Sequence, residues 1–197
     1  MFTEAARAQQ PYVGGDLWTQ SRVLQALQVW VGYTQDDATS TAISAALDYS
    51  ANRFRLAQEQ GEAFAPYTGD SCGRGHDLMI VEVAAEQFRR TSDPALLTLA
   101  SAVYDGFSQA DLSWPDADDQ LGQLLSDSPV IGHGAHTAEY LRVPLLLADL
   151  NADSRLRTAF DNGYQKITRA LGVAGGLKSD ETISAPGGHP VPLPESG

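Results

Sequence analysis

Cysteine and basic residues are both scarce in this chain of 197 residues. Cys72 is the single cysteine, so the chain cannot form an internal disulfide or build a cysteine-rich zinc site by itself. Thirteen Lys and Arg stand against 25 Asp and Glu, which gives a net charge of −12. Nucleic acids and anionic membranes both require a basic binding face, so the composition argues against either partner. A neutral or cationic small molecule is the expected ligand.

Long apolar runs are also missing. No segment approaches the roughly 20 apolar residues that are needed to cross a bilayer. The first residues, Met1 to Arg7, lack the basic end and apolar core of a secretory signal, so the expected location is the cytoplasm. Alternation of apolar and polar residues is nearly absent, which indicates few or no strands.

Apolar residues at helical spacing are abundant, and they predict an all-α protein. The first predicted helix begins with Asp16 as its N-cap and ends near Tyr33. Its expected apolar face consists of Val23, Leu24, Leu27, Trp30 and Val31.

The predicted helices form a repeat. The motifs Thr34-x-Asp36, Thr91-x-Asp93 and Asn151-x-Asp153 lie 57 and 60 residues apart (36 to 93 to 153), and an amphipathic helix flanks each on both sides. This pattern predicts three helical hairpins with short inner turns. An open stack of hairpins leaves exposed ends, so we interpret residues 1–171 as part of a toroid.

Residues 172–197 are rich in Gly and Pro and are expected to form a loop or tail. The alternative for the whole chain is a small open helical domain with a tail. The open apolar edge of a partial toroid makes self-association an expected property.

The stretch from Gly132 to Pro144 concentrates unusual chemistry in one predicted helix, expected to run to about Leu150. His133, His136 and Glu139 could supply three ligands to a metal, although the i,i+4 histidine pair typical of helical zinc sites is absent. The alternative is a helix whose polar face contacts solvent and has no binding or catalytic role.

Unusual residues also mark the equivalent helix starts. Asp16 and Trp18 begin the first hairpin, His76 and Asp77 begin the second, and His133 and His136 begin the third. Equivalent ends of equivalent helices point the same way, so these residues should converge at one end of the array. A polar pocket with an aromatic platform such as Trp18 suits a sugar, so the expected ligand is a small-molecule carbohydrate.

A glycine-rich loop, Gly175 to Glu181, carries the acidic pair Asp180 and Glu181. Two neighbouring carboxyl groups can hold one acid protonated beside one ionised, as acid–base chemistry on a glycosidic bond requires. The alternative is a solvated pair without a catalytic role.

Three segments together resemble a known family. Gly75 to Asp93, Gly132 to Pro144 and Gly175 to Glu181 are similar, in order and approximate spacing, to the two Gly-His helices and the Gly-Gly acidic loop of six-hairpin glycosidases of the β-L-arabinofuranosidase family. The resemblance covers about residues 16–185. It implies that the chain forms about half of an (α/α)6 barrel and acts on a terminal glycosidic bond.

The resemblance also implies residue roles. His76 and His133 would contact sugar hydroxyls, with His136 as a further candidate, and Glu181 would be the general acid/base. The family's nucleophile is a cysteine held near a zinc ion, and its ligands follow the Gly-Gly loop; Cys72 is not in the matching place. Asp16-Leu17-Trp18 stands where the family has His-Glu-Leu-Tyr.

These departures shape the functional hypotheses. The chain is expected to be an incomplete glycosidase that is inactive alone, with no cofactor in this chain and zinc only in a longer protein. The alternative is a non-catalytic carbohydrate-binding or scaffold protein. A uronyl hydrolase or sugar epimerase is a third hypothesis, which the motifs fit less well.

Overall fold

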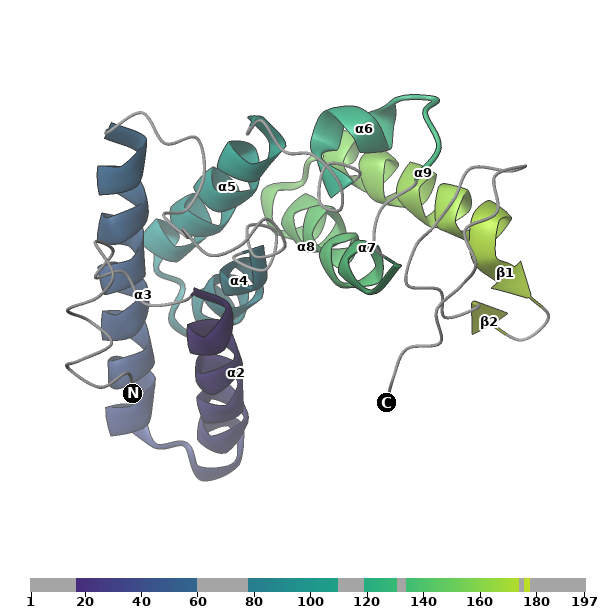
Figure 1. Cartoon of the computed structure of the whole chain (residues 1–197). Coiled ribbons are helices and arrows are strands. Elements are labelled where there is room, and N and C mark those ends of the chain that lie inside the picture. The colour runs from purple at the N-terminus through teal and green to yellow at the C-terminus, as the bar shows by residue number, and fades with distance from the viewer. Residues whose placement is uncertain (1–16, 60–77, 110–118, 131–133, 174–175, 178–197) are drawn as a thin grey trace, which may run out of the picture.

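A computed structural model describes residues 17–59, 78–109, 119–130, 134–173 and 176–177 of the chain (Figure 1). The described residues are almost entirely helical, as the sequence predicts. The strands among the described residues form one two-residue antiparallel ladder, in which Gly172 pairs with Leu177. The elements are α2 (Leu17–Thr34), α3 (Asp37–Glu59), α4 (Met79–Thr91), α5 (Pro94–Gln109), α6 (Leu121–Leu125), α7 (Gly134–Tyr140), α8 (Arg142–Asn151), α9 (Ser154–Leu171), β1 (Gly172–Val173) and β2 (Gly176–Leu177).

Three tight turns join the helices into hairpins: α2 with α3, α4 with α5, and α8 with α9. In each turn, the residue after the first helix adopts the left-handed conformation and its backbone N–H closes the helix. These residues are Gln35, Ser92 and Ala152, with φ of 56°, 59° and 53°. Because the left-handed residue reverses the chain in one step, the next helix can start immediately.

An aspartate follows the left-handed residue in all three turns and caps the second helix. Asp36 accepts a hydrogen bond from the backbone N–H of Ala38, and Asp93 and Asp153 accept the equivalent bonds two residues further on, at 2.8–3.0 Å. Asp36 also accepts a bond from the Thr39 hydroxyl, and this bond lowers the pKa of the Asp36 carboxyl. The repeat that the sequence predicts is therefore present as three copies of one turn.

The hairpins lie side by side in two layers (Figure 1). The first helices α2, α4 and α7–α8 form an inner row, and the second helices α3, α5 and α9 form an outer row. Within the described residues the hairpins follow an arc that does not close into a ring. The all-α class and the hairpin packing are confirmed, and the assignment of the chain to about half of a toroid stays a prediction.

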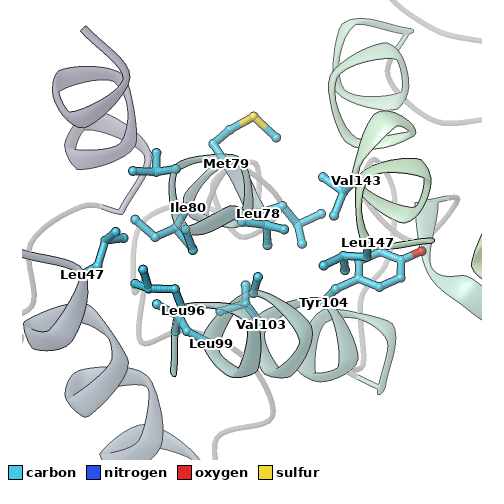
Figure 2. Packing of buried hydrophobic residues seen from close by; sticks show 14 of the residues in the cluster. Leu47, Leu78, Met79, Ile80, Leu96, Leu99, Val103, Tyr104, Val143 and Leu147 are labelled. Carbon is cyan, nitrogen blue, oxygen red and sulfur yellow. The ribbon is translucent and has the colours of Figure 1, made fainter. Parts of the chain in front are cut away.

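The main core lies between the rows and between successive hairpins (Figure 2). Leu47 of α3 points toward Ile80 of α4, and Tyr104 of α5 lies beside Leu147 of α8. All four side chains are fully buried. Burial of a large apolar side chain contributes about 1.5–3 kcal/mol, so contacts between hairpins hold the array together.

The predicted apolar face of the first helix is partly wrong. Val23 and Trp30 are 55% and 56% exposed, whereas the polar residues Ser21 and Gln28 are buried. The Gln28 side-chain amide donates to the backbone carbonyl of Val83 in α4 at 2.9 Å, which compensates the cost of burying it. The buried face of α2 is therefore set by its contacts with α3 and α4, and it is rotated from the apolar stripe.

The single helix predicted from His133 to Leu150 is also wrong, because the chain divides at Leu141 into α7 and α8. Pro144 has no backbone N–H, so it cannot donate to the carbonyl of Tyr140, and its ring crowds that carbonyl. Pro144 fits the first turn of a new helix, where the N–H has no partner within the helix. The break falls where the missing hydrogen bond would have been.

Candidate functional site

Polar side chains collect on the exposed side of the inner row, which we call the inner face. The face is organised by the repeat, since residues separated by 57 and then 60 positions occupy the same level on successive inner helices. Two levels follow from this spacing. Arg22 and Glu139 form the first, with the buried Met79 as the equivalent residue between them, and Gln25, Glu82 and Arg142 form the second.

Ion pairs and hydrogen bonds link the inner helices at both levels. Arg22 of α2 forms an ion pair with Glu139 of α7, which lies on the third hairpin. Glu82 of α4 receives a hydrogen bond from the Gln25 amide at 2.8 Å on one side and forms an ion pair with Arg142 on the other. The side chains of Glu82 and Glu139 are 18% and 19% exposed, and each pairs with a more exposed arginine.

The network also has internal cross-links. The Arg22 guanidinium donates to the Gln25 side-chain oxygen at 3.1 Å, and the Arg142 guanidinium lies 3.7 Å from the Met79 sulfur. These contacts join the first level to the second. A partly buried network with both signs of charge presents donors and acceptors in fixed directions, which is what recognition of a polyhydroxyl compound requires.

A shallow pocket of about 360 Å³ adjoins the network. Gln25 and Glu82 belong to both, and the third repeat level, Val29, Glu86 and Leu146, lines the pocket. Its remaining lining residues are Gln28, Arg89 and Arg90. The apolar groups of Val29 and Leu146 lie beside carboxylates and guanidiniums, a mixture that matches the apolar faces and hydroxyl rim of a sugar.

Two of the predicted site residues are described, and they lie at the same end of the inner row. Trp18 precedes Arg22 by one helical turn on α2, and His136 precedes Glu139 by one turn on α7. The Arg22–Glu139 ion pair joins these two helices. Trp18 and His136 each lie about one turn closer to the N-terminus of their helix than the residue that forms the ion pair. Trp18 is 40% exposed.

His136 differs from Trp18 in its surroundings. Its side chain is 8% exposed, and the imidazole packs against the Tyr140 ring with centroids 5.4 Å apart. Burial leaves little of this imidazole accessible from outside the fold. The site therefore combines an open indole with a fixed imidazole.

The other predicted site residues, Asp16, His76, His133 and Glu181, lie outside the described residues. The predicted meeting of His76, His133 and Glu181 in one pocket stays a prediction. Among the described residues, no three His, Cys, Asp or Glu side chains form a group suited to a metal ion. Because His133 lies outside the described residues, the alternative in which His133, His136 and Glu139 bind a metal stays open.

Sequence reasoning missed the residues that build the polar network, namely Arg22, Gln25, Glu82 and Arg142. The signal was present in the repeat, because Gln25, Glu82 and Arg142 occupy the same position in three successive units. A position that is polar in every repeat, on helices whose other sides are buried, indicates a shared functional or solvated face.

Comparison of the chain with models of protein families, with curated proteins and with solved structures found no match. None of the described helices is long and apolar enough to cross a bilayer.

Proposed function

We propose that this chain binds a saccharide on its inner face as part of a glycoside hydrolase of the β-L-arabinofuranosidase type. The observation that carries the proposal is the pocket between α2, α4 and α8, where Gln25 and Glu82 of the polar network lie beside the apolar Val29 and Leu146. The three hairpins would supply about half of an (α/α)6 barrel, with the inner face directed toward its centre.

The network supports this role because its donors and acceptors already have fixed positions. Gln25, Glu86 and Arg90 line the pocket with an amide, a carboxylate and a guanidinium. Glu86 and Arg90 form an ion pair at 3.0 Å, which orients both groups without a ligand. Preorganised polar groups bind a sugar with a smaller loss of side-chain entropy.

The expected direction of the substrate follows from the candidate residues. A saccharide that fills the pocket can extend along the inner face, past Arg22 and Glu139, toward Trp18 and His136. The exposed indole of Trp18 offers an apolar platform to the C–H face of a sugar ring. Glu181 remains the proposed general acid/base.

Binding can be tested by isothermal titration calorimetry with arabinofuranose-containing oligosaccharides and, for comparison, with glucose and xylose oligomers. We expect saturable binding that Gln25→Ala and Trp18→Ala each weaken by about tenfold. Trp30→Ala is the matched control, because Trp30 is also an exposed indole on α2 but lies off the inner face. The absence of binding by every saccharide at about 10 mM would overturn the proposal.

A non-catalytic carbohydrate-binding protein is the second candidate. The observation that favours it is the pairing of Glu82 and Glu139 with arginines, because both described carboxylates then serve to hold the polar network together. An aryl β-L-arabinofuranoside that releases a coloured phenol separates the candidates. Saccharide binding with no hydrolysis, also in a longer protein that contains this chain, would favour the second.

A further inference from the structure

The two ends of the hairpin array carry exposed apolar side chains at positions that are buried inside the array. We call the side of a hairpin that meets the preceding hairpin its leading edge, and the side that meets the following hairpin its trailing edge. The repeat spacing allows the same position to be followed from one hairpin to the next.

The leading edge of the second and third hairpins is buried. Ile80 and Gln87 of α4 are fully buried, and the Gln87 amide donates to the Ser44 hydroxyl of α3 at 3.0 Å. On the third hairpin, Tyr140 packs edge-on against Phe107 of α5, with centroids 6.3 Å apart. Leu147 lies beside Tyr104 (Figure 2).

The same positions on the first hairpin are exposed. Subtracting 57 from Ile80 and Gln87 gives Val23 and Trp30, which are 55% and 56% exposed. Val23 and Trp30 therefore occupy interface positions on a hairpin whose leading edge meets no other hairpin among the described residues. Their exposure follows from the absence of a covering hairpin among the residues that the structure describes.

The trailing edge shows the complementary pattern. Leu47 and Tyr104 are buried by the following hairpin, and adding 57 and then 60 to position 47 gives Tyr104 and Tyr164. Tyr164 is 53% exposed, and it stacks on Phe160 of its own helix with ring centroids 6.1 Å apart. The last hairpin thus exposes a tyrosine at the position where the preceding hairpin buries one.

We infer that a second copy of this chain docks the trailing edge of its third hairpin, around Tyr164, on the leading edge of the first hairpin, around Val23 and Trp30. The contact continues an interface that occurs twice within the chain, between the first and second hairpins and between the second and third. Both halves of that interface are present on each copy, so no other protein is required. The inference does not depend on the proposed function.

The geometry of the contact is head-to-tail. Such a contact closes into a ring if its rotation is a whole fraction of a turn, and otherwise it extends into a filament. Two arcs of three hairpins would close as a dimer with two identical interfaces. The inner faces of both copies would then look toward a common centre.

Sedimentation velocity of the whole chain across roughly 1–100 μM tests the inference. We expect a dimer or larger assembly, and we expect Val23→Glu to raise the dissociation constant by about tenfold or more. Val29→Glu is the matched control, since Val29 is another exposed valine of α2, at 63%, but faces the inner side. A monomer at every concentration, or equal effects of the two variants, would overturn the inference.

Cysteine cross-linking tests the head-to-tail geometry. In a Cys72→Ser background, a Trp30→Cys variant is mixed with a Tyr164→Cys variant under mild oxidation. We expect a disulfide between positions 30 and 164 of different copies. Links from 30 to 30 alone would show a symmetric contact between two leading edges and would contradict the inference. Circular dichroism of each variant checks that the helices are retained.

Discussion

Arg22 of α2 forms an ion pair with Glu139 of α7, although these residues belong to the first and third hairpins. They occupy equivalent positions in the repeat, and Met79 of the middle hairpin is the equivalent residue between them. The pair therefore spans the inner row at a single level. It links the first and the last helices of the inner row directly.

The strength of this ion pair can be measured with a double-mutant cycle of Arg22→Met and Glu139→Gln. We expect a coupling free energy of about 0.2–1 kcal/mol that decreases with salt, because the Arg22 side chain is 42% exposed and solvent screens the pair. Urea unfolding of the four proteins gives the value. Arg157 and Asp161, an exposed pair within α9, provide the comparison. Coupling that salt leaves unchanged would contradict a screened pair.

The left-handed residue of the third turn offers a stabilising substitution. Ala152 has φ of 53°, where a Cβ atom costs about 1 kcal/mol, so Ala152→Gly should raise the free energy of unfolding by about 0.5–1 kcal/mol. Thermal or urea unfolding measures the change. Ala138→Gly is the control, because Ala138 is an exposed residue of α7 and glycine there should destabilise by about 0.5–1 kcal/mol. Equal losses for both variants would contradict the assigned turn.

Two helical glycines should respond to alanine in opposite ways. A Cβ at Gly163 of α9 would lie 2.4 Å from a Leu141 methyl group and 2.8 Å from a Leu124 methyl group, so overpacking should destabilise by about 1–3 kcal/mol. A Cβ at Gly122 of α6 meets no atom within 4 Å, and Gly122→Ala should stabilise by about 0.5–1 kcal/mol. Urea unfolding of both variants checks the close contact of α9 with α6 and Leu141. A stabilised Gly163→Ala variant would show that the leucines move aside easily.

Because of Tyr104, the free energy of unfolding should decrease as the pH rises into the alkaline range. Burial, reinforced by the Asp119 carboxylate, raises the pKa of the Tyr104 phenol well above its usual value of about 10. Above about pH 10 the Tyr104 phenol loses its proton in the unfolded protein but retains it in the folded protein. The free energy of unfolding therefore falls, by up to about 1.4 kcal/mol per pH unit for this group.

Tyr104→Phe removes this dependence, since phenylalanine has no proton to lose. Urea unfolding between about pH 8 and 11 should show a shallower decline for Tyr104→Phe than for the unchanged protein. Tyr33→Phe is the control, because Tyr33 is 87% exposed. Parallel pH profiles for the unchanged protein and Tyr104→Phe would contradict the assigned burial of the phenol.

The turns were predictable from sequence because their chemistry is local. An aspartate before a helix, preceded by a polar or small residue, places the cap and the chain reversal within a few neighbouring residues. Asp36, Asp93 and Asp153 therefore marked all three hairpins without knowledge of the tertiary structure. The break at Leu141 was also readable in principle, since Pro144 removes one particular backbone hydrogen bond.

The candidate site was predictable to a smaller extent. Trp18 and His136 were identified by residue type and position in the repeat, and the structure places both beyond the Arg22–Glu139 pair on the same row. Arg22 and Gln25 were missed, because a lone arginine or glutamine on a helix is usually a solvated surface residue. Their significance depends on partners that lie far away in the sequence.

The sequence by itself determined the helical class, the three hairpins and the turns between them, because capping and helix formation depend on residues a few positions apart. Only the tertiary structure decided which side of each helix is buried. Val23 and Trp30 have the same apolar character as Ile80 and Leu147, yet the first two are exposed and the others are buried. The difference lies in whether a neighbouring hairpin covers them, because burial is a property of the packed array and not of the side chain.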